Sequence, residues 1–282
     1  MRQITVFTHR DPYDIAAALA ELIKQAGEAG VTLRFDPEET AKLRLQPAEG
    51  LALDAPIERD VELCVALGGD GTILRALQHY AATDVPVFAI NFGEVGFLAT
   101  VEPQDLPGGV ARALQGEFEL LHLPAITVEL PEGGPLYAMN DLAITRKVGD
   151  RVAELSYSLD GEEAGSVRCD GLVVATPAGS TGYNLANGGP VMAWGVEGLV
   201  VSFIAPHSIT ARALVVAPGD RISIRTGTRQ PLDVAVDGRP SGVVQPGAII
   251  HAHFVKHLGT LAQLPGSSFY RRLREKFGRL AS

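Results

Sequence analysis

The sequence predicts an α/β protein with a doubly wound N-terminal lobe, a β-rich C-terminal lobe and a closing helix that packs back on the first lobe. In residues 1–117 apolar strand-like runs alternate with helical patterns, as in the parallel sheet of a Rossmann-like lobe. In residues 118–262 the segments are short, strand-like and divided by turns, which favours antiparallel sheets. Residues 263–282 contain one amphipathic helical pattern.

The first lobe begins with two expected strands, Ile4–Thr8 and Val31–Phe35. The helix between them is expected to start at Asp11-Pro12, because the acid can cap the first turn and proline needs no donor there. Residues 46–60 mix proline, glycine and charges without a clear period. We expect this stretch to be a mobile loop that closes over a ligand.

A glycine-rich turn organises the lobe. The apolar run Leu63–Leu67 leads into Gly68-Gly69-Asp70-Gly71-Thr72, and a helical pattern follows, so the context is strand, tight turn and helix. Glycines permit positive φ and leave no Cβ in the way, so a phosphate can lie on the main chain at the start of a helix. We predict phosphate binding by Gly68, Gly69, Gly71 and Thr72.

Asp70 is the unusual residue of this turn. A carboxylate repels a phosphate unless it holds a magnesium ion or takes a proton from an attacking hydroxyl. Either use indicates phosphoryl transfer. The alternative is structural: the glycines make the corner and Asp70 caps the helix.

The remaining elements follow in order. Val85–Ile90 is an expected strand that leads into a second glycine-containing run, and Asp105–Leu114 is an expected helix. Turns in the second lobe are expected at Glu132-Gly133-Gly134-Pro135, Asp160-Gly161, Pro218-Gly219-Asp220 and Asp237-Gly238. The closing helix is expected over Ser267–Gly278.

In a second stretch, Asp170–Pro190, an expected strand runs into a loop that is rich in glycine and hydroxyl groups and contains one aromatic residue. Ser180 and Thr181 can cap a short helix, and Tyr183 can stack on a ring such as adenine or nicotinamide. The alternative is a surface loop whose glycines serve only turns. Long loops in compact domains are more often functional or disordered, which favours a binding loop.

Two residue pairs give weaker indications. The Asn140 amide suits a purine edge and the Asp141 carboxylate suits ribose hydroxyls, although Asn-Asp is also a common turn. Arg168 and Asp170 would share one strand face, and taken by themselves they favour an ordinary surface ion pair.

Composition limits the partners. A formal net charge of −9 and a pI near 5.3 argue against a nucleic-acid partner. Apolar runs fall short of the ~20 residues that a membrane-spanning helix needs, and the start of the chain lacks a secretory pattern. We therefore expect a cytoplasmic location and no membrane partner. Cys64 and Cys169 do not belong to a spaced set of metal ligands, so we expect both to be reduced thiols.

Taken together, these stretches resemble the NAD kinases of the bacterial type, which make NADP by phosphorylating the adenosine ribose 2′-hydroxyl of NAD with ATP or polyphosphate. The Gly68–Thr72 turn alone is shared with diacylglycerol kinases, sphingosine kinases and phosphofructokinases. Three later runs narrow the resemblance: Gly93–Leu98 is similar to the family's Gly-x-x-Gly-Phe-Leu, and Thr176–Pro190 and Phe269–Phe277 also fit.

The chain departs from the family pattern at two places. The usual Asn-Glu pair is Asn140-Asp141, and the usual Thr-Ala-Tyr-x-x-Ser run is Thr181-Gly182-Tyr183-Asn184-Leu185-Ala186.

The resemblance implies that Asp70 accepts the proton, that Asp170 faces the nicotinamide carboxamide, and that Arg168 lies near the ribose that gains phosphate. Because the family forms dimers and tetramers, Arg168 is expected to reach across from a neighbouring subunit. A divalent metal, expected to be magnesium, and ATP or polyphosphate are implied as well. The dinucleotide site implied by the resemblance comprises Asp70, Gly71, Arg75, Asn140, Asp141, Arg151, Arg168, Asp170, Thr181, Gly182, Tyr183, Asn184, Leu185, Ala186, Ala205 and Arg239.

Two alternatives stay open on the sequence. A lipid kinase of the same superfamily would need a basic or amphipathic surface, which an acidic chain does not indicate. A dinucleotide-binding regulator without catalysis would be expected to lack the acid of the glycine turn, and Asp70 is present.

Overall fold

A computed structural model describes residues 2–94, 96–227 and 229–278. The chain divides into two compact units. Unit 1 contains Met1–His122 and Gly259–Ser282, and unit 2 contains Leu123–Leu258. The boundaries expected from the sequence, after residues 117 and 262, stay predictions of where the domains divide.

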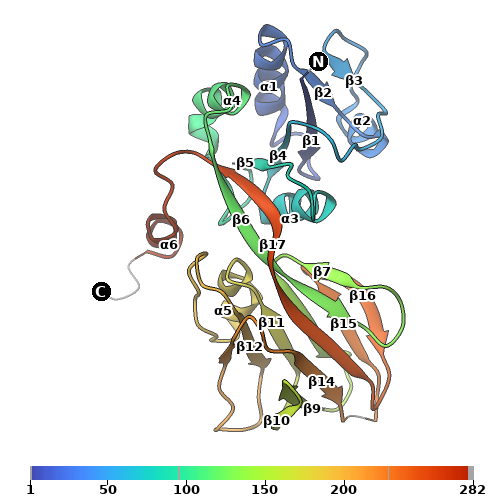
Figure 1. Cartoon of the computed structure of the whole chain (residues 1–282). Coiled ribbons are helices and arrows are strands. Elements are labelled where there is room, and N and C mark those ends of the chain that lie inside the picture. Colours follow the sequence, from blue (N-terminus) through green and yellow to red (C-terminus); the bar gives the residue numbers. More distant parts are fainter. Residues whose placement is uncertain (1, 95, 228, 279–282) are drawn as a thin grey trace. The chain divides into compact units, whose positions relative to one another are not determined.

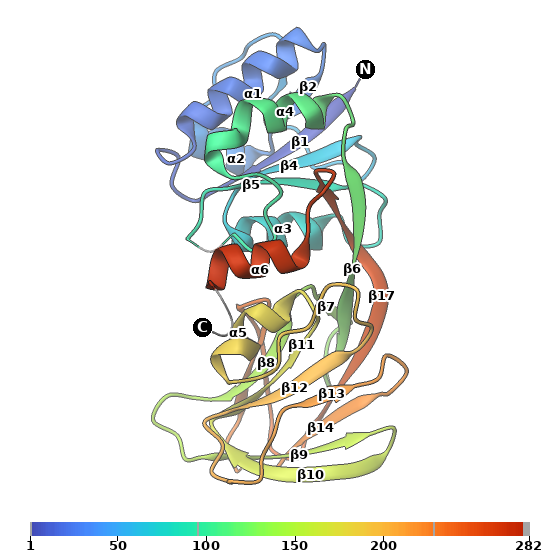
Figure 2. The same cartoon turned by 90° about the vertical axis from the view of Figure 1, so that its left-hand side faces the viewer.

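Unit 1 is built on a parallel sheet in which β5, β4, β1, β2 and β3 are neighbours in that order. Helices α1 and α4 cover one face, and α2 and α3 lie on the other (Figure 1). Figure 2 shows α1 and α4 side by side. The predicted doubly wound lobe is therefore confirmed. The bounds are β1 Gln3–Thr8, β2 Thr32–Arg34, β3 Leu51–Ala52, β4 Leu63–Gly68, β5 Val87–Asn91, α1 Ala16–Glu28, α2 Pro37–Leu43, α3 Asp70–His79, η1 Pro103–Asp105, α4 Leu106–Leu114 and α6 Phe269–Phe277.

The expected start of the first helix is wrong. Helix α1 begins at Ala16, and the carboxylate of Asp11 instead accepts the N–H of Tyr13 at 3.0 Å, which makes a turn before the helix. The same Asp-Pro signal is genuine at Asp36-Pro37, where Asp36 accepts the Glu39 N–H at 2.7 Å and starts α2. The sequence interpretation missed this helix.

The stretch expected to be a loop, residues 46–60, contains the short strand β3. This strand extends the parallel sheet, because Leu51 and Ala52 pair with Leu33 and Arg34 of β2. Two residues are too few for a hydrophobic period to be visible in the sequence.

Unit 2 consists of two layers of mainly antiparallel strands. One is a six-stranded sheet in the order β13-β12-β11-β8-β15-β16, and β10, β9, β14, part of β17, β6 and β7 form the other layer. The bounds are β6 Glu119–Glu129, β7 Leu136–Ala138, β8 Asp141–Arg146, β9 Ala153–Leu159, β10 Glu162–Cys169, β11 Gly171–Ala175, η2 Gly179–Thr181, α5 Tyr183–Ala186, β12 Leu199–Ile204, β13 Leu214–Val216, β14 Ile222–Thr226, β15 Leu232–Val236, β16 Arg239–Val244 and β17 Ile249–Gln263.

The expected Asp-Gly hairpins are present in unit 2. Asp160-Gly161 joins β9 to β10, Asp237-Gly238 joins β15 to β16, and all four residues have positive φ. Asp and Gly tolerate this conformation better than other residues, so these turns fix the register of their hairpins.

The two layers of unit 2 enclose an apolar core. Alternate residues of the strands point inward, and examples that are almost fully buried are Leu142, Leu155, Leu172, Ile222 and Ile250. A smaller apolar cluster on the six-stranded sheet includes Met192, which follows the glycine-rich loop. The loop is thereby anchored to the sheet.

Two long strands, β6 and β17, carry the chain from one unit to the other (Figure 1). Strand β17 pairs antiparallel with β14 through Ile249–Ala252 and parallel with β5 through Leu261 and Ala262. The chain that leaves β17 forms α6 within unit 1, which confirms the expected return of the closing helix. Residues 279–282 of the expected closing segment lie outside the described residues.

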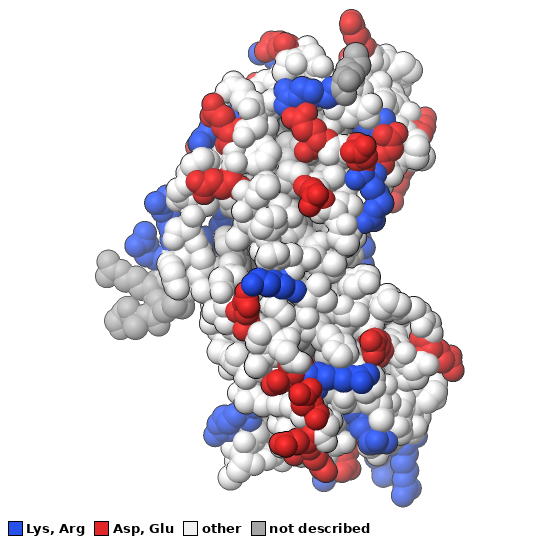
Figure 3. Space-filling model, viewed as in Figure 1, with Lys and Arg blue, Asp and Glu red and all other residues white. Residues whose placement is uncertain are grey.

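Charged side chains of both signs lie on the surface. On the face shown in Figure 3, basic and acidic side chains are interspersed over both units. Among the described helices, none combines the length and the hydropathy required to cross a membrane.

Candidate functional site

The glycine turn of unit 1 connects β4 to α3. Gly69 is the N-cap of α3 and Asp70 is its first residue. The prediction that these glycines supply positive φ is wrong, because the positive-φ glycines do not include Gly68, Gly69 or Gly71. Gly68 and Gly69 instead allow neighbouring atoms to pack closely against the main chain. A Cβ on Gly68 would collide with the Thr72 side chain, and one on Gly69 would lie 3.0 Å from the Gly93 Cα. Gly71 has open space where a Cβ would lie.

The Asp70 carboxylate does not cap its own helix. It accepts the Phe97 N–H on Oδ2 at 3.1 Å and the Leu98 N–H on Oδ1 at 3.0 Å. Each oxygen keeps a further lone pair, so the carboxylate can accept another proton or hydrogen bond. The second glycine run therefore fixes the acid of the first, a contact that the sequence did not reveal.

The second glycine run is itself tightly folded. Gly96 has a φ of 62°, and a Cβ there would collide with the Asn91 side chain. The Asn91 Oδ1 accepts the Gly93 N–H at 3.0 Å, and a Cβ on Gly93 would lie 2.7 Å from the Gly69 Cα. Val95, the remaining variable position of this run, lies outside the described residues. The two glycine runs thus fit against each other through their backbones.

Arg75 projects from α3 into a network of charges. Its Nη2 donates to the Thr8 carbonyl oxygen at 3.2 Å and bonds the Glu39 carboxylate, and its guanidinium lies 5.0 Å from the centre of the Phe7 ring. Glu39 is 1% exposed and also pairs with Lys42 at 2.7 Å. The sequence interpretation missed Glu39, which lies in the unexpected helix α2.

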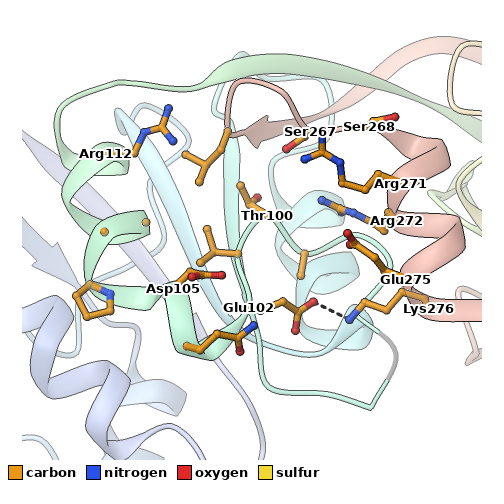
Figure 4. A pocket seen from close by; sticks show the side chains of 17 residues that line it. Thr100, Glu102, Asp105, Arg112, Ser267, Ser268, Arg271, Arg272, Glu275 and Lys276 are labelled. Atoms are coloured by element: carbon orange, nitrogen blue, oxygen red, sulfur yellow. Dashed lines mark hydrogen bonds and ion pairs between the residues drawn. The ribbon is translucent and has the colours of Figure 1, made fainter.

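A cavity of about 660 Å³ lies between α4 and α6 in unit 1 (Figure 4). Arg112 lines it from α4, and Arg271, Arg272 and Lys276 line it from α6. Lys276 pairs with Glu102 at 2.6 Å. The residues that line this cavity include none of the residues predicted from the sequence to bind substrate.

In unit 2 the Asn140-Asp141 turn is held by Asp237. The Asp237 carboxylate accepts the N–H groups of Met139, Asn140 and Asp141 at 3.0, 2.7 and 3.1 Å. Asp141 is 7% exposed, and this burial, together with the nearby Asp237 charge, raises the pKa of its carboxyl from 3.8 to about 7. The sequence indicated Asp237 only as a turn residue.

The glycine-rich loop of unit 2 is held by buried polar side chains. The Ser180 hydroxyl donates to the Pro177 carbonyl oxygen at 2.7 Å and accepts the Met192 N–H at 2.8 Å. The Asn184 amide donates to the carbonyl oxygens of Ser180 and Pro190, both at 3.0 Å. Both side chains are fully buried. They stabilise the loop from inside.

The prediction that Ser180 or Thr181 caps a short helix is wrong. The N-cap of α5 is Gly182, and no side chain caps it; the Thr181 hydroxyl instead donates to the Ala178 carbonyl oxygen at 3.1 Å. The outward part of this loop carries Gly182, Tyr183 and Ala186, whereas Thr181 and Leu185 are half-buried. Tyr183 is 40% exposed, so its ring is accessible for stacking.

Asp170 lies between β10 and β11 and therefore outside both strands. Its partner is Arg146, whose Nε and Nη2 donate to the two carboxylate oxygens at 2.6 and 3.1 Å. The guanidinium of Arg146 lowers the pKa of Asp170. The expected pairing of Asp170 with Arg168 on one strand face is therefore wrong, and no local pattern in the sequence marks Arg146 as the partner.

A cavity of about 770 Å³ in unit 2 brings several arginines together. Arg146, Arg151, Arg168 and Arg229 line it, with Asp150 and Glu154. Two residues predicted separately, Arg151 and Arg168, thus share one cavity. Its excess of guanidinium groups suits a phosphate.

The last two predicted residues lie at strand ends in unit 2. Ala205 follows β12 with a φ of 43°, an uncommon conformation for a residue other than glycine. Arg239 is the first residue of β16, directly after the turn that contains Asp237.

Comparisons with known proteins agree with this architecture. Residues 13–118 match the ATP-NAD kinase N-terminal domain, and residues 139–255 match the ATP-NAD kinase C-terminal domain. The NAD kinase of Gemmatimonas aurantiaca is 31% identical over 98% of this chain and 96% of its own length. The NAD kinase of Rhodopirellula baltica is 34% identical over 78% of this chain and 73% of its own length.

Solved structures match as well. Yeast NADH kinase complexed with NADH has the same fold, with a TM-score of 0.88 and 23% identity over 100% of this chain and 89% of that chain. An NAD kinase from Archaeoglobus fulgidus in complex with ATP has a TM-score of 0.74 and 26% identity over 99% of this chain and 98% of that chain. The fold is thus shared with nucleotide-dependent kinases. The chain belongs to the NAD kinase family.

Proposed function

We propose that the chain transfers the γ-phosphoryl group of ATP to the 2′-hydroxyl of the adenosine ribose of NAD, giving NADP and ADP. The observation that carries the proposal is the Asp70 carboxylate, which two backbone N–H groups hold at a glycine corner, in a chain of the NAD kinase family. Membership in this family also separates the chain from the lipid kinases that share the turn.

Unit 1 supplies the chemistry. A loose phosphoryl-transfer transition state mainly requires alignment and stabilisation of charge. The first N–H groups of α3 and the bare main chain of Gly68–Thr72 cradle the donor phosphates. Asp70 aligns the 2′-hydroxyl and takes its proton as the new P–O bond forms and the bond to the leaving ADP breaks.

Magnesium fits this arrangement as an ion that is bound to the phosphates of the donor. The described residues contain no group of three or more His, Cys, Asp or Glu side chains that could hold a metal. Mg²⁺ commonly uses one or two carboxylates, several waters and the substrate phosphates, so the donor phosphates and waters would supply most of its ligands, with at most one from Asp70. When bound, the ion neutralises charge on the phosphates.

Unit 2 binds the dinucleotide in this proposal. Asn140 and Asp141 bind the adenosine part, Tyr183 stacks on a base, and Asp170 accepts from the nicotinamide carboxamide. The Arg146 pair supports the last role because it keeps a carboxylate acceptor in a fixed orientation.

The experiment is a coupled assay. The purified protein is incubated with NAD, Mg²⁺ and ATP, and any NADP is measured with an NADP-specific dehydrogenase. Polyphosphate in place of ATP, and NADH in place of NAD, define the donor and acceptor preferences. We expect NADP with ATP; no NADP with any donor would overturn the proposal.

We further propose a cytoplasmic homodimer or homotetramer in which Arg168 acts on the substrate of a neighbouring subunit. The arginine-lined cavity of unit 2 supports a phosphate role for Arg168. Mixing Asp70→Asn subunits with Arg168→Ala subunits tests this arrangement. Activity of the mixture well above that of either variant alone is expected, and no recovery after subunit exchange contradicts it.

A further inference from the structure

Asp70 depends on a neighbouring segment for its orientation. Both of its carboxylate oxygens accept backbone N–H groups, from Phe97 and Leu98 at 3.1 and 3.0 Å. A carboxylate bound through both oxygens follows the backbone that holds it. The position of the candidate catalytic acid therefore depends on what fixes Phe97 and Leu98.

Helix α6 fixes Phe97 by its carbonyl group and by its ring. The Nη1 of Arg272 donates to the Phe97 carbonyl oxygen at 2.8 Å, and its Nη2 donates to the Oε1 of Gln263 at 3.0 Å. The Phe97 ring packs on Phe269 and Phe277, with ring centres 5.6 and 5.9 Å apart. One residue is thus held by α6 while its N–H holds Asp70.

A second contact ties the far end of the same segment to α6. Lys276 pairs with the Oε1 of Glu102 at 2.6 Å, as the dashed line in Figure 4 shows. The other Glu102 oxygen accepts from the Asn91 amide at 3.0 Å, at the end of β5. The segment 97–102 is therefore attached to α6 at both ends.

The charge of Arg272 calls for an explanation beyond packing. Figure 4 shows its side chain extending from α6 toward the segment that carries Thr100. Burial lowers the pKa of this guanidinium, while the charges of Asp70, Glu102 and Glu275 act in the opposite direction. Burying a cation costs free energy that an apolar residue would avoid. The electrostatic attraction between Arg272 and Asp70 is a function that an apolar residue at this position could not perform.

We infer that Arg272 is a positioning residue for phosphoryl transfer: through the Phe97 carbonyl and through its charge it holds the Asp70 carboxylate in the orientation that accepts the 2′-hydroxyl proton. The inference rests on the role proposed for Asp70. In this role Arg272 acts through Asp70 and Phe97 and not directly on the substrate or the donor.

The test compares three variants of the full-length protein. Arg272→Met removes the charge and the forked hydrogen bonds but keeps most of the side-chain volume. We expect kcat to fall about tenfold to a hundredfold, because a small displacement of a catalytic group has an effect of that size. The KM values for NAD and ATP should stay within about threefold, since the inferred role of Arg272 is to orient Asp70 and not to bind either substrate. Arg272→Lys keeps the charge and should recover part of the loss.

Arg274→Met is the matched control, because Arg274 is an exposed arginine of the same helix. It should leave kcat unchanged. A purely structural role for Arg272 would lower the melting temperature and the yield but leave kcat per folded molecule at the wild-type value. That result overturns the inference, as does a change confined to KM. If Arg272→Met does not fold, wild-type kcat in Arg272→Lys overturns it.

A double variant separates this inference from the proposed function. In an Asp70→Asn background, Arg272→Met should reduce the residual kcat by less than about twofold, because it acts through Asp70. A full additional loss contradicts the inference. If Asp70→Asn alone keeps wild-type turnover, the proposed role of Asp70 fails; if only Arg272→Met does so, the inference fails alone.

Discussion

The two units prepare their candidate sites in different ways. In unit 1 the site is made of backbone: Gly69 fits against Gly93, and the N–H groups of Phe97 and Leu98 hold Asp70. In unit 2 the site is made of buried side chains, because the Asp237 carboxylate fixes the Asn140-Asp141 turn and polar groups inside the glycine-rich loop hold its shape. Where two backbones touch, as at Gly69 and Gly93, the site has no room for an added Cβ, whereas a side-chain site fails when a hydrogen-bonding group is removed.

The largest effect is expected in unit 1, at the acid itself. Asp70→Asn keeps the shape but removes the proton acceptor and one of the two hydrogen bonds from Phe97 and Leu98, because the amide nitrogen cannot accept an N–H. We expect kcat to fall about 10²–10⁴-fold with NAD affinity preserved, measured by the coupled assay and by calorimetry. Asp60→Asn, an exposed position of the same unit, is the control and should be unchanged. Near-normal turnover of Asp70→Asn rejects the role.

The backbone fit of unit 1 is tested by one methyl group. Gly69→Ala puts a Cβ 3.0 Å from the Gly93 Cα, so the two turns must separate. The expected loss is about 1–3 kcal/mol in the free energy of unfolding, together with lower turnover. Gly71→Ala should be tolerated in the free protein, because no atom lies within 4 Å of the added carbon. Equal stability of the two variants in a urea titration would contradict the close backbone fit between Gly69 and Gly93.

The side-chain support of unit 2 is tested at two similar turns. The Asp237 carboxylate accepts three N–H groups, whereas Asp160, in another Asp-Gly turn, accepts one, from Arg221 at 3.2 Å. Asp237→Asn should lower the free energy of unfolding by about 1–2 kcal/mol and raise the KM for NAD. Asp160→Asn should do neither. If both variants behave alike, the Asp237 contacts do not stabilise the adenosine turn.

The smallest effect is a pH dependence at Asp141. Its pKa is raised from 3.8 to about 7, so the folded state favours the protonated form, and the stability associated with it is lost as the pH rises from about 4 to 7. Over that range Asp141→Asn should gain stability relative to wild type. A ribose hydroxyl donates to the ionised carboxylate, so the KM for NAD should rise in wild type below about pH 7 and stay flat in Asp141→Asn. Parallel pH profiles of the two proteins would contradict this assignment.

The features that the sequence reveals are local ones, and the features that it hides depend on contacts between distant residues. The glycine runs, the Asp-Gly hairpins and the apolar periods are local patterns, so the lobes and the position of Asp70 were predictable from them. Some contacts join residues that are far apart in the sequence, and no local pattern marks them. The separations are 96 residues for Asp237 and Asp141, 24 for Arg146 and Asp170, and 175 for Arg272 and Phe97. The helix start expected at Asp11 was wrong for a related reason. The same Asp-Pro dipeptide occurs at Asp11-Pro12 and at Asp36-Pro37, and only the second leads directly into a helix, so the local pattern cannot tell them apart.

The most direct test is a crystal structure of the Asp70→Asn protein with NAD bound. The account predicts that the side-chain oxygen or nitrogen at position 70 lies within hydrogen-bonding distance, about 3 Å, of the 2′-oxygen of the adenosine ribose. It also predicts that the N–H group of Phe97 or of Leu98 still donates to the side-chain oxygen at position 70. A structure in which position 70 lies far from this sugar, with the dinucleotide bound elsewhere, would contradict the central claim.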